Sequence, residues 1–120
     1  MERIRFIDHD GRRVLLVDCA GCQPQEMAEL ADQLSKFLDP EPDESVLLLA
    51  DFTGAQFTRE SIERIKISAV YNRRHLKSSA WVFNGNLSKT MHDAVQAFSR
   101  RNIPKFETRE EAIKFLVDGG

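Results

Sequence analysis

The chain of 120 residues has the composition of an ordinary globular domain, with 42% hydrophobic and 30% charged residues. We expect one domain over residues 1–120, large enough to form a core without a disulfide or a structural metal. The net charge of −2 argues against binding nucleic acid by neutralising its phosphates. No apolar run approaches the roughly 18 residues of a membrane span, and the N-terminal segment lacks the apolar region of a signal peptide, so the sequence predicts a cytoplasmic location.

The first third of the chain predicts a hairpin followed by a helix. Residues 3–8 alternate, with Ile4 and Phe6 on one side, which is typical of a half-exposed strand. Asp10-Gly11 is a strong hairpin signal before the apolar run at 14–17. A helix then opens at Pro24, and its apolar stripe is Met27, Leu30, Ala31, Leu34 and Leu38.

The middle third predicts two buried strands around a helix. Residues 46–50 form the first strand, and Asp-Phe-Thr-Gly follows directly at 51–54. Thr58 can cap a helix over 58–74, because hydroxyl residues satisfy the free N–H groups of a first turn. We expect its inner face to contain Ile62, Ile65, Ala69 and Tyr71. Residues 79–83 form the next strand, with Trp81 and Phe83 in the core.

The last third predicts two helices around a short strand at 105–107. We expect Ser88 to cap the first helix, whose inner stripe is Met91, Val95 and Phe98, with His92 and Asp93 on a solvated face. Thr108 opens the last helix with a T-x-x-E capping box. The order β-β-α-β-α-β-α-β-α predicts an α/β fold with a mostly parallel five-stranded sheet and four helices.

The loops that follow parallel strands should gather at one edge of this sheet, where open α/β proteins bind ligands. They are residues 19–23, 51–57 and 84–88, and we expect Thr108 at the same edge. Asn84 and Ser88 place amide and hydroxyl groups near a helix N-terminus, which favours an anion. The alternative is that such residues serve only as helix caps.

The opposite edge should collect cations, which either complement the negative helix ends or bind an acidic partner or a phospholipid headgroup. These cations are Arg73, Arg74, His75, Lys77, Arg100, Arg101 and Lys105.

The segment VLLLADFTGAQF at 46–57 leads from a buried strand into Asp51, Thr53 and Gly54. A hydroxyl residue between an acid and a glycine at this place resembles the switch loop of STAS domains, the anti-sigma-factor antagonist modules of bacteria. In that family a Ser or Thr just before the glycine is phosphorylated by a kinase partner, and its state controls binding. The resemblance therefore implies that Thr53 is a phospho-switch within a partner-binding loop.

The resemblance covers nearly the whole chain and is greater to the small stand-alone SpoIIAA-like proteins of bacteria. Three patterns match: V-D-x-x-G at 17–21, D-x-T-G at 51–54 and F-x-T-R-E-E-A at 106–112. That group resembles both STAS domains and the lipid-binding CRAL-TRIO fold. It implies a STAS-like element order and, as an alternative to partner binding, a lipid or small apolar anion as ligand.

Two features of the loop keep a structural role for Thr53 open. Phe52 stands where the antagonists usually have a first hydroxyl residue, and residues 55–58 lengthen the loop before the helix. The alternative is that Thr53 acts as a cap in a T-x-x-Q box with Gln56.

Cys19 and Cys22 form a C-x-x-C pair between a strand and a helix, as in a thioredoxin-type site. However, Cys19 follows the strand end directly, and Ile103-Pro104 comes too late to be the proline that thioredoxins place opposite their active site. We therefore expect incidental loop cysteines. A zinc site needs four ligands, and the scattered histidines supply no second pair, so we expect no metal and no cofactor.

These observations favour a regulatory module that binds a protein partner, such as a kinase or regulator, and is not an enzyme. Motifs of hydrolases, P-loop proteins and dinucleotide-binding proteins are missing from the sequence. The alternative is a small carrier of a lipid or apolar anion, and a more distant one is a thiol redox protein acting through Cys19 and Cys22. A homodimer through exposed helix faces is compatible with each.

Overall fold

The computed structural model describes residues 2–119, except for the side chains of residues 86–88. The strands are β1 (Ile4–His9), β2 (Arg12–Asp18), β3 (Val46–Asp51), β4 (Leu76–Val82) and β5 (Lys105–Phe106). The helices are α1 (Pro24–Leu38), α2 (Arg59–Asn72), α3 (Asn86–Ser99) and α4 (Arg109–Asp118), and a 3-10 turn (Arg73–His75) joins α2 to β4. None of the described helices is both long and apolar enough to cross a membrane.

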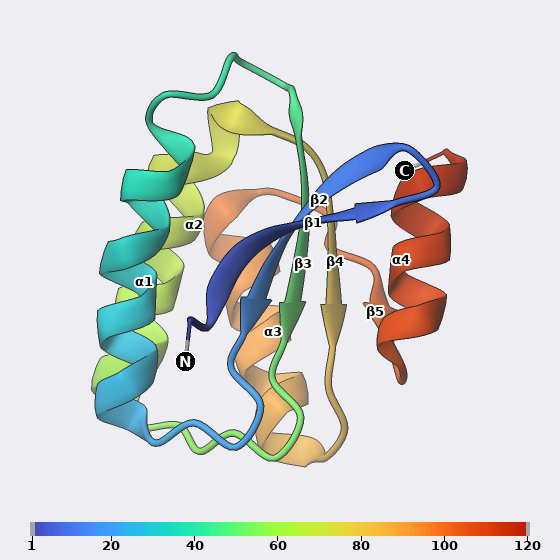
Figure 1. The fold of residues 1–120 in the computed structure, drawn as a ribbon. Coiled ribbons are helices and arrows are strands. Elements are labelled where there is room, and N and C mark those ends of the chain that lie inside the picture. Colours follow the sequence, from blue (N-terminus) through green and yellow to red (C-terminus); the bar gives the residue numbers. More distant parts are fainter. Residues whose placement is uncertain (1, 120) are drawn as a thin grey trace.

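The strands form one sheet in the order β1-β2-β3-β4-β5 (Figure 1). β1 pairs antiparallel with β2, and all other neighbours pair in parallel. Helices α1, α2 and α3 cover one face of the sheet, and α4 covers the other. This arrangement confirms the predicted α/β class and element order.

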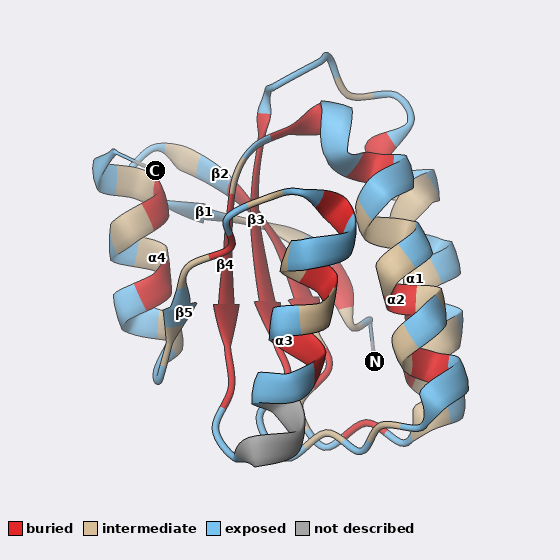
Figure 2. Cartoon of the chain, turned by 180° about the vertical axis from the view of Figure 1, so that it is seen from behind, coloured by how far each residue is buried: buried red, intermediate tan, exposed pale blue. Residues whose placement is uncertain are grey.

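The central strand β3 shows why its sequence is an uninterrupted apolar run. Leu48 and Ala50 belong to the core beneath α1, α2 and α3, whereas Leu47 and Leu49 belong to the core beneath α4. All six residues of β3 are buried, because both faces of the sheet are covered. Figure 2 shows the buried strands between helices whose outer surfaces are exposed.

The hairpin and most helix starts follow local sequence signals, as predicted. Asp10 and Gly11 both have positive φ, 49° and 79°, as the two-residue turn between β1 and β2 requires. Pro24 is the first residue of α1. Thr58 and Thr108 cap α2 and α4, each accepting a hydrogen bond from the backbone N–H three residues ahead.

Helix α3 begins earlier than predicted. Its first residue is Asn86, and its N-cap is Gly85, whose φ of 94° suits a residue without a Cβ atom. Ser88 therefore lies inside the helix, and the prediction that it is the cap is wrong. Its side chain lies outside the described part of the structure.

Three side chains face the other way from their predicted side. Tyr71 and Phe98 are 61% and 50% exposed, so neither belongs to the core. His92 is buried instead of solvated: its Nε2 lies 2.6 Å from the Ile103 carbonyl oxygen. For His92 and Phe98 the reason is the orientation of α3, which turns Met91, His92, Val95 and Ser99 inward, whereas Tyr71 lies on α2.

Fewer of the predicted cations lie exposed at the edge of the sheet opposite the 51–57 loop than the sequence suggested. His75 is buried, with Nδ1 2.8 Å from the Glu41 carbonyl oxygen. Lys105 pairs with Trp81 in the carboxyl half of β4, away from that edge.

Candidate functional site

Two loops join at the carboxyl edge of the sheet, where β2 and β3 end side by side. The parallel pairing of Asp18 with Asp51 continues beyond the strands, because the Gly21 N–H donates to the Thr53 carbonyl oxygen at 2.9 Å. The Cys19 N–H likewise donates to the Asp51 carbonyl oxygen at 2.8 Å. These bonds fix the loop after β3 against the loop after β2, as the edge of a parallel sheet predicts.

Asp51, Thr53 and Gly54 form a tight turn at this edge. The Thr53 hydroxyl donates to Asp51 Oδ1 at 2.6 Å, and the Thr53 N–H donates to the same oxygen at 2.9 Å. Gly54 has a φ of 69°, which explains a glycine there, whereas a Cβ atom would meet its nearest neighbour only at 3.9 Å. Asp51 is buried while Thr53 is exposed, so the hydroxyl connects the surface to an interior carboxylate.

The T-x-x-Q capping role for Thr53 is wrong. Helix α2 begins at Arg59, and its N-cap is Thr58, so Thr53 lies well ahead of the helix. The Thr53 hydroxyl is used by Asp51 instead.

Arg109, the first residue of α4, joins the two strand ends. Its Nε donates to Asp51 Oδ2 at 2.6 Å, and its Nη2 lies 2.9 Å from Asp18 Oδ1. The Asp51 side chain is 7% exposed and that of Asp18 is 18% exposed, so one guanidinium forms ion pairs with two largely buried carboxylates. We call Asp18, Asp51, Thr53 and Arg109 the switch network.

The hydrogen bonds of this network outweigh the cost of burying Asp51. Burial alone would raise the pKa of Asp51, but the bonds from Thr53 and then from Arg109 stabilise the ionised form, so the pKa lies below its ordinary value. For Arg109, burial opposes the charge, yet Asp51 and Asp18 together raise the pKa of its guanidinium above the ordinary value. Asp51 and Arg109 are therefore both ionised at neutral pH.

Sequence reasoning selected Asp51, Thr53 and Gly54 but missed Asp18 and Arg109 as site residues. A signal was present: two acids end two neighbouring buried strands, and such a pair requires a cation. Arg109 belongs to the pattern at 106–112, and Asp18 to the pattern at 17–21. The three patterns that carry the family resemblance thus meet in one network.

Asn84 and Ser88 do not extend this site. Asn84 is exposed between β4 and α3, and among the described residues no hydrogen bond or ion pair joins it to the switch network. The anion-binding role predicted for Asn84 and Ser88 stays a prediction, since the Ser88 side chain lies outside the described part.

Cys19 and Cys22 lie beneath the same edge as free, buried thiols, 3% and 0% exposed. The hydrogen bond between them raises the pKa of Cys19, with burial adding to the effect, and lowers the pKa of Cys22. Reactive thiols need access to solvent, so their burial disfavours a redox role. Among the described residues, no group of three or more His, Cys, Asp and Glu side chains is placed to hold a metal ion.

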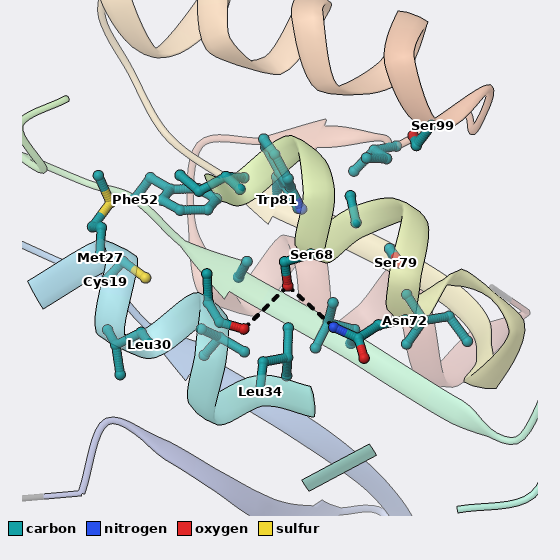
Figure 3. Close-up of a pocket in the computed structure, with 18 of the residues that line it drawn as sticks. Cys19, Met27, Leu30, Leu34, Phe52, Ser68, Asn72, Ser79, Trp81 and Ser99 are labelled. Atoms are coloured by element: carbon teal, nitrogen blue, oxygen red, sulfur yellow. Dashed lines mark hydrogen bonds between the residues drawn. The ribbon is translucent and has the colours of Figure 1, made fainter. Parts of the chain in front are cut away.

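A cavity of about 70 Å³ lies between the sheet and the helices α1, α2 and α3. Figure 3 shows its lining: Cys19, Met27 and Phe52 at one end, Asn72 and Ser79 towards the other. Dashed lines mark the bonds from Asn72 Nδ2 to Ser68 Oγ and from Ser68 Oγ to a carbonyl oxygen of α1. The lining is mostly apolar, with its polar groups concentrated where α2 and α3 end.

Comparisons with known proteins agree with this architecture. No protein-family model matches the chain, and no curated protein matches it. Among solved structures, it is similar to an uncharacterised DUF3478-family protein with a SpoIIAA-like fold from Shewanella loihica PV-4. The match has a TM-score of 0.69 and 14% sequence identity, and it covers 94% of this chain and 91% of that one. The chain therefore has a SpoIIAA-like, STAS-like fold, as the sequence resemblance implied.

Proposed function

We propose that this protein is a non-enzymatic regulatory module that binds a protein partner through the 51–57 loop and helix α2, with Thr53 as its switch residue. The observation that carries the proposal is the switch network, in which the exposed Thr53 hydroxyl donates to the buried Asp51 carboxylate at 2.6 Å. A chemical modification of this hydroxyl therefore removes its hydrogen bond to Asp51, and Asp51 in turn is bonded to Arg109. The SpoIIAA-like fold supports this role by analogy with the antagonist modules.

Phosphorylation of Thr53 would change the network in a definite way. A kinase transfers the terminal phosphoryl group of a nucleoside triphosphate to Oγ1, which loses its proton, and the nucleoside diphosphate leaves. The phosphate brings about −2 charge beside two carboxylates, so the bond to Asp51 is lost and the phosphate competes for Arg109. The loop must then move, and a partner that reads its shape binds differently.

Exposed apolar side chains gather towards the C-terminal ends of α2 and α3, at the end of these helices away from the 51–57 loop, and they suit a protein partner. Ile67 and Tyr71 lie one turn apart on α2 and are 58% and 61% exposed. Phe98 of α3 is 50% exposed, and the Lys66 Nζ of α2 lies 4.8 Å from the centre of its ring. Exposed apolar side chains that gather on two adjacent helices are typical of an interaction surface. The same surface is available for a homodimer.

A second candidate function, the carrier of a lipid or apolar anion, is favoured by the cavity shown in Figure 3. Its volume of about 70 Å³ lies well below the ~300 Å³ at which pockets for drug-sized ligands begin. The cavity therefore suits a small ligand better than an intact lipid.

The test of the regulatory proposal is a set of charge variants in the 51–57 loop. Tagged wild type, Thr53→Glu and Gln56→Glu are used to capture partners from the native host, and the intact mass of the wild type is recorded. We expect a stoichiometric partner with wild type and Gln56→Glu and its loss with Thr53→Glu, whose circular dichroism stays native. Gln56→Glu adds the same charge to the loop without touching Asp51. If Thr53→Glu binds the partner as tightly as wild type, the switch proposal is wrong.

A further inference from the structure

Two buried polar atoms in the cavity have no hydrogen-bond partner. Among the described residues, Asn72 Oδ1 and Arg101 Nε are the buried side-chain atoms left unpaired. Both residues line the cavity, and Asn72 is only 1% exposed. Buried polar groups in folded proteins are almost always paired. Two unpaired atoms in one cavity require polar partners there, either water or the polar group of a bound molecule.

The positive charge of Arg101 indicates that the polar group of the occupant is an anion. Arg101 donates through Nη2 to the Leu76 carbonyl oxygen at 3.2 Å, which leaves Nε free. Burial lowers the pKa of its guanidinium, and the nearby charge of Arg73 lowers it further, while Glu44 offsets this only in part. No carboxylate of the described residues forms an ion pair with Arg101. A half-buried cation whose Nε atom is fully enclosed is stabilised by an anion.

The remainder of the cavity is mostly apolar. Met27 and Phe52 lie at the end away from Asn72, as Figure 3 shows, and the Trp81 ring packs edge-on against Phe52 with 4.7 Å between ring centres. An occupant must therefore combine an anionic head with a hydrocarbon body. The volume of about 70 Å³ is several times the ~10–15 Å³ that one water needs on the same measure, which limits that body to a short chain.

We propose that this cavity binds a short-chain carboxylate, with its head on Arg101 and Asn72 and its hydrocarbon chain towards Met27, Phe52 and Trp81. The Arg101 Nε–H donates to one carboxylate oxygen. A half-turn of the Asn72 amide directs Nδ2 to the other oxygen and Oδ1 to the Ser68 hydroxyl, which then donates its single proton to Oδ1 instead of to the Ala31 carbonyl oxygen. The exchange conserves the shape of the Asn72 side chain. The inference rests on the carrier function and is independent of the switch at Thr53.

In the first test, the full chain is titrated with hexanoate, and binding is monitored through the fluorescence of Trp81. This residue is the single tryptophan of the chain, is 5% exposed and lines the cavity. Hexanol and hexylamine are titrated in parallel, because they have the same chain with a neutral or a cationic head. We expect saturable binding of hexanoate, binding of hexanol at least about tenfold weaker, and none of hexylamine. Equal affinity for hexanol and hexanoate overturns the inference.

Two variants locate the head group. Arg101→Met keeps the length of the side chain and removes its charge, and we expect it to weaken hexanoate binding at least about tenfold without weakening hexanol binding. Arg100→Met is the matched control, since Arg100 is the neighbouring arginine but is exposed, and it should bind hexanoate as wild type does. Unchanged binding in a folded Arg101→Met variant overturns the assignment. If that variant does not fold, the comparison of head groups on wild type decides.

Chain length distinguishes a short carboxylate from a lipid-derived fatty acid. Butanoate, hexanoate, octanoate and palmitate are compared on wild type, and we expect affinity to stop rising before palmitate because the cavity is small. No saturable binding of any of them overturns the inference and leaves water as the occupant. Tight binding of hexanol or of palmitate alone would keep the carrier function while rejecting the short carboxylate.

Discussion

Removal of the Arg109 guanidinium tests the switch network most directly. Arg109→Met keeps an unbranched side chain but leaves Asp51 and Asp18, whose side chains are 7% and 18% exposed, without their shared cation. The Asp51 carboxylate keeps only the bonds from Thr53. We expect a less stable protein with the same fold, because α4 is also held by its apolar contacts with the sheet.

The size of the expected loss in stability follows from the burial of Arg109, Asp51 and Asp18. Leaving one buried charge unpaired costs about 3–5 kcal/mol, but the Arg109 side chain is 35% exposed, so solvent screens part of this interaction. We therefore expect a loss of about 2 kcal/mol in the free energy of unfolding. For a chain of 120 residues this corresponds to a fall in Tm of about 8 °C.

The loss should depend on pH with a definite sign. The pKa of Asp51 lies below its ordinary value in the folded protein, so its ionised form contributes stability above the unfolded pKa of about 4. That contribution disappears as the pH falls through the lower, folded pKa. In Arg109→Met, burial is no longer offset by the guanidinium, so protonation of Asp51 becomes easier. The gap in stability between wild type and variant should narrow below about pH 4.

Urea unfolding followed by circular dichroism, at neutral and at acid pH, measures both effects. Arg64→Met is the control, because Arg64 forms a surface ion pair with Asp32, and we expect no measurable change from its loss. Arg109→Lys should fall between wild type and Arg109→Met, since an ammonium group cannot donate to both carboxylates in the same geometry. The reasoning is refuted if Arg109→Met is as stable as wild type, or if its loss is the same at both pH values.

Three further changes test other parts of the structure. Thr53→Val removes the hydroxyl that donates to Asp51 and should lower the free energy of unfolding in urea by about 1–2 kcal/mol. Thr53→Ser keeps a hydroxyl and should lower it less, so equal losses would argue against the hydrogen bond. Met91→Ala should cost about 2–5 kcal/mol, because Met91 is fully buried, and Phe98→Ala much less, because Phe98 is half exposed. The reverse order of these two melting temperatures would contradict the orientation of α3. His92→Ala removes the bond to the Ile103 carbonyl oxygen and a ring that packs against Trp81, so it should lower the free energy of unfolding by about 2–3 kcal/mol. It should also alter the near-ultraviolet circular dichroism, and an unchanged spectrum would place His92 outside the core.

The order of the elements was determined by the sequence itself, because the signals involved are local. A two-residue turn at Asp10 and Gly11, a proline at the start of α1 and threonine caps at α2 and α4 act on residues within one turn of themselves. The apolar runs of β2 and β3 indicate that both faces of these strands are covered. The alternation of strands and helices along the chain then predicts a largely parallel sheet. The edge that carries Asp51 and Thr53 follows from this topology.

Other features of the protein were decided only by the tertiary structure, because they depend on contacts between distant segments. The bond between Arg109 and Asp51 joins residues 58 positions apart, so no local pattern specifies it. The burial of His92 and exposure of Phe98 depend on how α3 is oriented against the sheet, because a helix whose apolar stripe is interrupted can turn either side inward. The unpaired Nε of Arg101 is visible only once α2, α3 and β4 enclose the cavity, since burial is a property of the packed elements and not of the residue.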